Sequence, residues 1–239
     1  EQLVKQFVTG AVIAQRAGID GVEIHAAHGY LVNQFLSPHT NKRTDKYGGD
    51  LMDRMRFVTE IIKGIQAYCG PKFPISVRMN GDDFIEDGIK LEEAVRMAVI
   101  LEKLGVQCLN VSCGTYESGY TIIEPSSFAE GWKKHLAKAV KGAVSIPVIA
   151  VNNIKHPAVA EALLEEGGFD CVFHILNNSQ GLKSNLYYKK SLPSGLQGKL
   201  ESQMNEIFFD RILQDSLHIE PARFEKIQEL TKVNITTIQ

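Results

Sequence analysis

Several patterns that define common protein classes are missing from this sequence of 239 residues. It contains only four cysteines, and no two of them form a CxxC pair, so neither a zinc ribbon nor a closely spaced iron–sulfur run is encoded. The longest apolar runs, such as residues 146–151, are far shorter than the ~20 residues that a membrane-spanning helix needs. A basic excess is missing as well, because 26 lysines and arginines face 28 aspartates and glutamates, which argues against a nucleic-acid partner.

What remains is the composition of a globular protein, with 44% apolar and 23% charged residues. A chain of this length fits one α/β barrel or two smaller domains. We expect reduced, mostly buried cysteines and a cytoplasmic location without a membrane partner. The chain begins at Glu1 with a charged segment and no apolar signal region, so we expect no signal peptide and a chain that was processed or cut from something longer.

Helical and strand patterns alternate along the first part of the chain. Because the strand segments are continuous apolar runs, we expect a parallel sheet buried on both faces. Repeated strand–helix units indicate an α/β fold, either a doubly wound sheet or a (β/α)₈ barrel, whose chemistry lies at the carboxyl ends of the strands. The predicted helices are 2–17, 51–68, 91–104, 135–144 and 157–166, and the predicted strands are 19–26, 74–79, 106–112, 146–151 and 169–175.

The pattern changes near residue 176. Residues 176–198 are rich in Asn, Ser, Gly and Lys and are predicted to form a loop. Residues 199–215 and 221–233 have helical patterns, but neither segment continues the strand–helix alternation. We therefore divide the chain into a barrel-like part, residues 1–175, and a divergent part of unknown role, residues 176–239.

The first predicted strand ends in two histidines and a tyrosine, His25, His28 and Tyr30. Two imidazoles can donate hydrogen bonds to one oxygen and polarise a carbonyl group, and a phenol beside them can deliver a proton. The same residues are also compatible with two structurally satisfied histidines in a turn. Zinc is less favoured, because the HExxH motif and an evident third ligand are absent, and we expect no metal.

Two later strand ends carry further candidates. Arg78 ends an apolar strand, where a guanidinium needs an anion or several acceptors, such as a flavin pyrimidine edge, a carboxylate or a phosphate. A structural salt bridge to Glu23 or Asp82 would satisfy it equally well. Asn152 and Asn153 precede a predicted helix, so their backbone amides are candidates for holding a phosphate, with a simple βα turn as the alternative.

Taken together, these residues belong to a long motif. Residues 18–57 read GIDGVEIHAAHGYLVNQFLSPHTNKRTDKYGGDLMDRMRF, and this segment resembles the signature of the Old Yellow Enzyme family of flavin oxidoreductases. The similarity is greatest to the bacterial 2-enoate reductase and NADH:flavin oxidoreductase branch. VRMNGDDFIEDG at 77–88 and VSCGTYE at 111–117 add to the resemblance, which covers about residues 1–172.

The resemblance implies an FMN-dependent (β/α)₈ barrel that passes hydride from NAD(P)H, through the flavin, to an activated C=C bond such as that of a 2-enoate or enone. His25 and His28 match the pair that holds the substrate carbonyl oxygen, and Tyr30 matches the proton donor. Arg78 matches the arginine beside flavin N1 and O2, which stabilises the anionic reduced flavin. Tyr116 loosely matches a further substrate-pocket residue.

The sequence also departs from the family pattern. It encodes about five of the eight βα units of a complete barrel, and the strands that would precede the histidine strand are missing. Asn152 stands where the family usually has glycine, and no Gly-Arg pair for the FMN phosphate follows the last predicted strand. The cysteine cluster for a 4Fe–4S centre and the FAD-type dinucleotide domain of larger relatives are not encoded. The predicted fold is therefore a partial barrel with an unrelated C-terminal segment.

Other functions stay open beside an ene-reductase. The chain is alternatively an inactive truncated or rearranged remnant, or a half-barrel that needs an oligomer or a barrel-completing partner, because open sheet edges invite aggregation. An unrelated barrel lyase or aldolase is disfavoured, since no lysine ends a predicted strand and Schiff-base chemistry needs one. We expect the isolated chain to bind FMN weakly or not at all.

Overall fold

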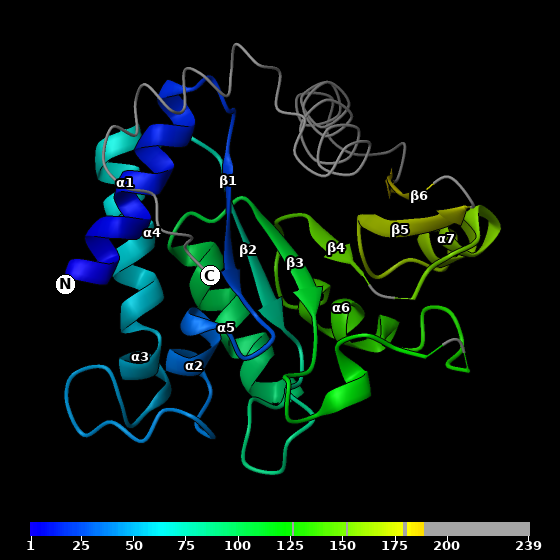
Figure 1. Ribbon diagram of the computed structural model, residues 1–239, viewed down its shortest axis with the longest axis horizontal. Helices are drawn as coiled ribbons and strands as arrows, with labels where there is room; N and C mark the ends of the chain where they lie inside the picture. Colours follow the sequence, from blue (N-terminus) through cyan, green and yellow to red (C-terminus); the bar gives the residue numbers. More distant parts are fainter. Residues whose placement is uncertain (126, 152, 179–180, 189–239) are drawn as a thin grey trace.

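The structure is a computed structural model that describes residues 1–125, 127–151, 153–178 and 181–188. One six-stranded sheet in the order β1-β2-β3-β4-β5-β6 runs through it (Figure 1). Neighbouring strands from β1 to β5 pair in parallel, and β6 pairs antiparallel with β5. The strands are β1 (Val22–Ala26), β2 (Ile75–Asn80), β3 (Cys108–Ser112), β4 (Val148–Ala150), β5 (Cys171–Asn178) and β6 (Gly181–Tyr188).

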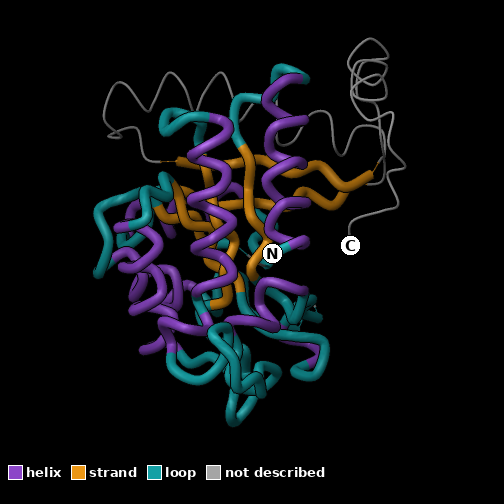
Figure 2. The backbone as a smooth tube through the Cα atoms, turned by 90° about the vertical axis from the view of Figure 1, so that its left-hand side faces the viewer, coloured by secondary structure: helices purple, strands orange, loops and turns teal. Residues whose placement is uncertain are grey.

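Helices connect successive parallel strands. Figure 2 shows two long helices, α1 and α4, lying side by side in front of the sheet. No helix in the described part of the chain is both long enough and apolar enough to cross a membrane. The helices are α1 (Gln2–Arg16), α2 (Leu31–Leu36), α3 (Leu51–Arg54), α4 (Arg56–Cys69), α5 (Leu91–Lys103), α6 (Lys134–Lys141) and α7 (Pro157–Glu166), with a 3₁₀ turn at Gly119–Thr121.

The predicted fold class is confirmed: parallel strands alternate with helices, as in part of a (β/α)₈ barrel. Each predicted strand and helix up to residue 175 has a counterpart at nearly the same place. The predicted helix 51–68 is interrupted at Met55, which separates α3 from α4. Helix α2 was not predicted, because six residues are too few to show a helical period.

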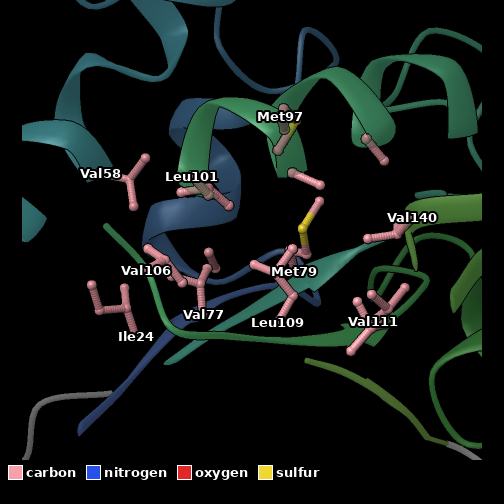
Figure 3. Packing of buried hydrophobic residues seen from close by; sticks show 14 of the residues in the cluster. Ile24, Val58, Val77, Met79, Met97, Leu101, Val106, Leu109, Val111 and Val140 are labelled. Carbon is pink, nitrogen blue, oxygen red and sulfur yellow. The ribbon is translucent and has the colours of Figure 1, made fainter. Parts of the chain in front are cut away.

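The predicted burial of both sheet faces holds only in part for β1 and β2, because one face of these strands is half-buried. Along β2, Val77 and Met79 are fully buried, whereas Ser76 and Arg78 between them are only half-buried. The apolar face packs against α4 and α5, where Val58, Met97 and Leu101 meet the strands (Figure 3). The opposite face carries the polar side chains of these strands, because consecutive residues of a strand point to opposite sides. Among the strands whose burial the structure describes, β1 to β4, β4 alone is buried at every residue, as a two-sided core strand requires.

The predicted loop at 176–198 is also partly wrong. Strand β5 continues to Asn178, and β6 pairs with it from Cys171↔Tyr188 to Asn178↔Gly181. The polar composition of this segment favours a loop, but strand pairing satisfies the backbone and overrides the weak local preference. The boundary proposed at 175/176 falls inside β5, and the helical patterns at 199–215 and 221–233 lie outside the described residues.

Helix α5 supplies the first testable prediction. Leu101 is 1% exposed and packs against the apolar face of the sheet, so Leu101→Ala leaves a cavity and is expected to lower the free energy of unfolding by about 2–5 kcal/mol. Urea denaturation followed by circular dichroism measures this loss. Leu3→Ala on α1 is the matched control, because Leu3 is 43% exposed and its truncation is expected to cost far less. Equal losses in the two variants would contradict the proposed packing.

Candidate functional site

The site is built on a row of side chains that crosses three neighbouring strands. His25 on β1 pairs in register with Arg78 on β2, and Arg78 pairs with Asn110 on β3. Residues paired in register point to the same face of a sheet. The three side chains therefore lie next to one another on the polar face, near the carboxyl ends of the strands.

Each member of this row has a buried polar atom without a hydrogen-bond partner among the described residues. These atoms are His25 Nδ1, Arg78 Nε and Asn110 Oδ1. Unsatisfied buried polar atoms are rare in native proteins, and three in adjacent positions call for an explanation. A polar ligand edge that accepts from Arg78 and also exchanges hydrogen bonds with His25 and Asn110 would satisfy the row.

The alternative interpretation of Arg78 as a salt-bridge residue is wrong. Within the described residues it forms no ion pair, while Asp82 lies 3.8 Å from Lys90 instead. The Glu23 carboxylate accepts hydrogen bonds from Ser76 Oγ at 3.0 Å and from Asn110 Nδ2 at 3.3 Å. Burial lowers the pKa of Arg78, and the negative charge of Glu23 opposes that effect without a direct contact. Burial likewise raises the pKa of Glu23.

His25 and His28 face each other at the end of β1. Their ring centroids are 5.2 Å apart and the rings are nearly perpendicular, at 88°. Burial, followed by the positive charge of Arg78, lowers the pKa of His25 to about 4 and that of His28 to about 3. Both imidazoles are therefore neutral at pH 7, and each carries one N–H donor. Among the described residues, no group of three or more His, Cys, Asp or Glu side chains is arranged to hold a metal ion.

His28 sits in a strained turn. Its φ of 62° lies in the left-handed region that residues other than glycine seldom adopt. Its Nε2 lies 2.6 Å from Ser112 Oγ, and its backbone amide donates to Asn80 Oδ1 at 3.3 Å. The interpretation of HxxH as two satisfied histidines is thus met in part by His28, but His25 Nδ1 has no partner in the part of the chain that the structure describes.

A buried polar network, which sequence reasoning missed, holds this turn in place. Asn33 Oδ1 accepts from the amide of Gly29 at 2.7 Å, and Asn80 Nδ2 donates to Asp83 Oδ1 at 2.7 Å. Ser37 Oγ donates to the other oxygen of Asp83, also at 2.7 Å. Asn33 and Ser37 belong to the long motif and Asn80 and Asp83 to the NGDD segment, so their polar character inside otherwise apolar surroundings was the available signal.

The two tyrosines meet at the mouth of the site. Tyr30 lies beside His25, with ring centroids 4.9 Å apart, and is 38% exposed. The hydroxyl groups of Tyr30 and Tyr116 are 2.6 Å apart, and this hydrogen bond raises the pKa of Tyr116. The structure therefore brings His25, His28, Tyr30 and Tyr116 together, although Tyr116 is far from the others in the sequence.

The turn at Asn152 and Asn153, which the sequence predicted to bind a phosphate, does not show unsatisfied polar atoms like those of the row on β1–β3 among its described residues. Asn152 lies outside the described residues, and Asn153 adopts a left-handed φ of 47°. The side-chain amide of Asn153 donates to the backbone oxygen of Phe128 at 2.8 Å, so this group holds a neighbouring loop. A cofactor-binding role for Asn152 and Asn153 stays a prediction.

The amides that precede α7 already have an anionic partner. The carboxylate of Glu130 accepts hydrogen bonds from the amides of Lys155 and His156, at 2.8 and 3.1 Å. A phosphate would have to displace this carboxylate to use the same amides. These described residues therefore do not offer a ready phosphate site, in contrast to the polar row on β1–β3.

The charge of Arg78 yields a second prediction. Arg78→Met removes the cation that disfavours protonation of both site histidines, so their pKa values are expected to rise, while burial keeps them below the ordinary value. Histidine-ring NMR over the acid range measures both pKa values. Arg96→Met on the exposed face of α5 is the matched control and is expected to leave them unchanged. Unchanged pKa values in Arg78→Met would remove Arg78 from this electrostatic role.

The sign of the pH effect on stability follows from the same shifts. A histidine whose folded-state pKa is lowered binds protons more readily in the unfolded chain. His25 and His28 therefore weaken the fold as pH falls from about 6.5 toward their folded-state pKa values of about 4 and about 3. Above pH 7 neither histidine changes stability in this way.

Known proteins share this arrangement of strands and motifs. The family model described as "NADH:flavin oxidoreductase / NADH oxidase family" matches residues 1–175. An NADH oxidase of Thermoanaerobacter brockii is 49% identical over 172 residues, which make up 72% of this chain and 26% of that protein. A cinnamate reductase of Clostridium sporogenes is 34% identical over 187 residues, covering 72% of this chain and 28% of the reductase.

Solved structures give the same picture. A 2-naphthoyl-CoA reductase in complex with 2-naphthoyl-CoA superposes with a TM-score of 0.68 at 34% identity, over 71% of this chain and 26% of that one. Morphinone reductase in complex with tetrahydroNAD superposes with a TM-score of 0.55 at 29% identity, over 72% of this chain and 44% of that one. The chain spans about a quarter of the length of the larger relatives. Since the family model covers most of the sequence, the chain belongs to the NADH:flavin oxidoreductase family, the Old Yellow Enzyme group that its motif resembles.

Proposed function

We propose that this chain carries the substrate-activating part of an FMN-dependent reductase that acts on activated C=C bonds. The observation that carries the proposal is the row of unsatisfied polar atoms on His25, Arg78 and Asn110 beside two neutral histidines. The relatives include proteins named cinnamate reductase and 2-naphthoyl-CoA reductase, whose names point to unsaturated substrates conjugated to a carbonyl group.

The two histidines are suited to bind a carbonyl oxygen. A neutral imidazole donates one hydrogen bond, and the perpendicular rings of His25 and His28 allow two donors to converge on one acceptor. If Ser112 Oγ donates to His28 Nε2, the ring proton of His28 lies on Nδ1 and is available to the substrate. Donors placed where negative charge develops on an enolate oxygen stabilise the transition state more than the ground state.

We assign the role of proton donor to Tyr30. Its ring lies beside that of His25, with centroids 4.9 Å apart, which supports a role next to the proposed carbonyl acceptor. Tyr116 shares a hydrogen bond with this hydroxyl and fixes the direction in which the phenol points. A phenol held in this way can protonate the α-carbon of the substrate while the β-carbon receives hydride.

The residues of the row fit the pyrimidine edge of a flavin. That edge carries carbonyl oxygens and nitrogens, which match a guanidinium N–H, an amide oxygen and an imidazole nitrogen that lack partners among the described residues. Bound FMN would supply the hydride, taken from NAD(P)H, which the chain's own side chains cannot provide. Arg78 would stabilise the negative charge of the reduced cofactor, and Glu23 would limit the loss of charge that burial imposes on Arg78.

Binding of FMN to the isolated chain is expected to be weak. Glu130 takes the amides that precede α7, so the phosphate end of the cofactor lacks a ready partner among the described residues. The negative charge of the Glu130 carboxylate would repel the FMN phosphate. This repulsion would offset part of the affinity gained at the pyrimidine edge.

Histidine-ring and arginine Nε NMR of the chain, titrated separately with FMN and with 2-cyclohexenone, tests the proposal. FMN is expected to shift the signals of His25 and Arg78, and the enone those of His25 and His28. Arg78→Met is expected to weaken FMN binding about tenfold, or ~1.4 kcal/mol, with Arg96→Met as the control.

The exposed His135 on α6, which has no proposed binding role, serves as an internal reference for unspecific effects. The proposal is contradicted if neither FMN nor 2-cyclohexenone shifts the signals of His25, His28 or Arg78 in a chain that circular dichroism shows to be folded. This result would then favour the inactive remnant.

A second candidate is a half-barrel that acts with a partner. Within the described residues β1 is an edge strand, paired only with β2, and the chain spans a fraction of its relatives. An unpaired parallel edge is a template for another strand. Sedimentation velocity over a range of concentrations tests this candidate: self-association is expected to grow with concentration, and a monomer throughout would exclude a second copy as the partner.

A further inference from the structure

Three loops at the carboxyl end of the sheet meet at His39. His39 follows α2, Asp87 lies between β2 and α5, and Glu117 follows β3. The Nδ1 atom of His39 is 2.5 Å from Asp87 Oδ1, and its Nε2 atom is 2.9 Å from Glu117 Oε2. One imidazole ring thus links segments that are 48 and 78 residues away in the sequence.

The geometry specifies the charge of this ring. A carboxylate only accepts hydrogen bonds, and a neutral imidazole has one donor nitrogen and one acceptor nitrogen. Both contacts of His39 are hydrogen bonds only when the ring is an imidazolium that donates from each nitrogen. In the neutral ring one nitrogen lone pair would face a carboxylate oxygen and one of the two links would be lost.

The two neighbouring carboxylates act in the same direction. The groups that face His39 are Asp87 and Glu117, and Lys42 on its own loop lies 3.3 Å from the other oxygen of Asp87. The hydrogen bond with Asp87 is the largest cause and raises the pKa of His39, partial burial of the ring opposes it, and the hydrogen bond with Glu117 raises the pKa further. His39 therefore differs from His25 and His28, whose pKa values are lowered.

The hydrogen bond between His39 and Glu117 is connected to the tyrosine pair through the backbone, because Glu117 and Tyr116 are neighbours in the sequence. Glu117 directly follows Tyr116, whose hydroxyl lies 2.6 Å from that of Tyr30. A cavity of about 180 Å³ is lined by His39, Tyr116 and Glu117 together with Gly29, which precedes Tyr30. Movement of the Glu117 loop away from His39 would therefore open this cavity and draw Tyr116 away from Tyr30.

We propose that His39 is a positioning residue whose imidazolium ties the three loops together and holds Tyr116 against Tyr30. The effect on proton delivery by Tyr30 rests on the proposed function, whereas the tie itself does not. The sign of its pH dependence follows from linkage: with a raised folded-state pKa, the stabilisation is complete below about pH 6.5 and is lost as pH rises through the folded-state pKa.

Proton–proton NOEs between the rings of Tyr30 and Tyr116 test the tie without flavin or substrate. In the unaltered chain the NOE is expected to be strong near pH 5.5 and to fall by about half or more near pH 9, following the titration of the His39 ring. His39→Gln keeps one link at most, so its NOE is expected to be weak at both pH values. His39→Lys keeps a cation between the two carboxylates and is expected to restore the NOE at both.

Matched variants separate this role from general stability. His156→Gln alters an exposed histidine that also has a carboxylate partner, Glu130, and is expected to leave the tyrosine NOE unchanged. Should His39→Gln fail to fold, the pH dependence of the tyrosine NOE in the unaltered chain still decides the question. An NOE independent of pH in the unaltered chain, or one unaffected in folded His39→Gln, would overturn the proposal. Neither of these NOE results would bear on the binding of FMN or of the enone. The separate titrations with these two compounds test the proposed function.

Discussion

The in-register parallel pairing of β1, β2 and β3 is the constraint on which the site depends. It places His25, Arg78 and Asn110 side by side on one face, while the alternate residues face α4 and α5 in the apolar core. A shift of one residue in either pair would exchange the two faces, bury the charge and expose the apolar side chains. The same packing that stabilises the sheet therefore also fixes the geometry of the polar row.

Charge then gives the histidines different roles. His25 and His28 are half-buried to buried beside the cation of Arg78, so the neutral form is favoured and each ring keeps one donor and one acceptor. His39 lies at the surface between two carboxylates, so the charged form is favoured and both nitrogens donate. Identical side chains thus serve as a neutral binding pair and as a cationic tie, because burial and the sign of the neighbouring charge differ.

Sequence patterns predicted the strand–helix alternation well, because helical periods and apolar runs are local and long enough to detect in α1, α4 and α5. They overestimated the burial of one face of β1 and β2, which is half-buried, since a few polar residues within an apolar run do not reveal which face they occupy. The pairing of β5 with β6 was missed for a related reason: strand formation there depends on a partner rather than on local composition.

By itself the sequence determined the family, the fold class and the residues of the motif, His25, His28 and Tyr30, because they lie in one local segment whose spacing is distinctive. Only the tertiary structure decided that Arg78 forms no ion pair within the described chain, that Glu130 takes the amides before α7, and that His39 joins two distant carboxylates. These features depend on the distance between residues that are far apart along the chain. Such distances are set by packing, and a single sequence does not encode them in any local pattern.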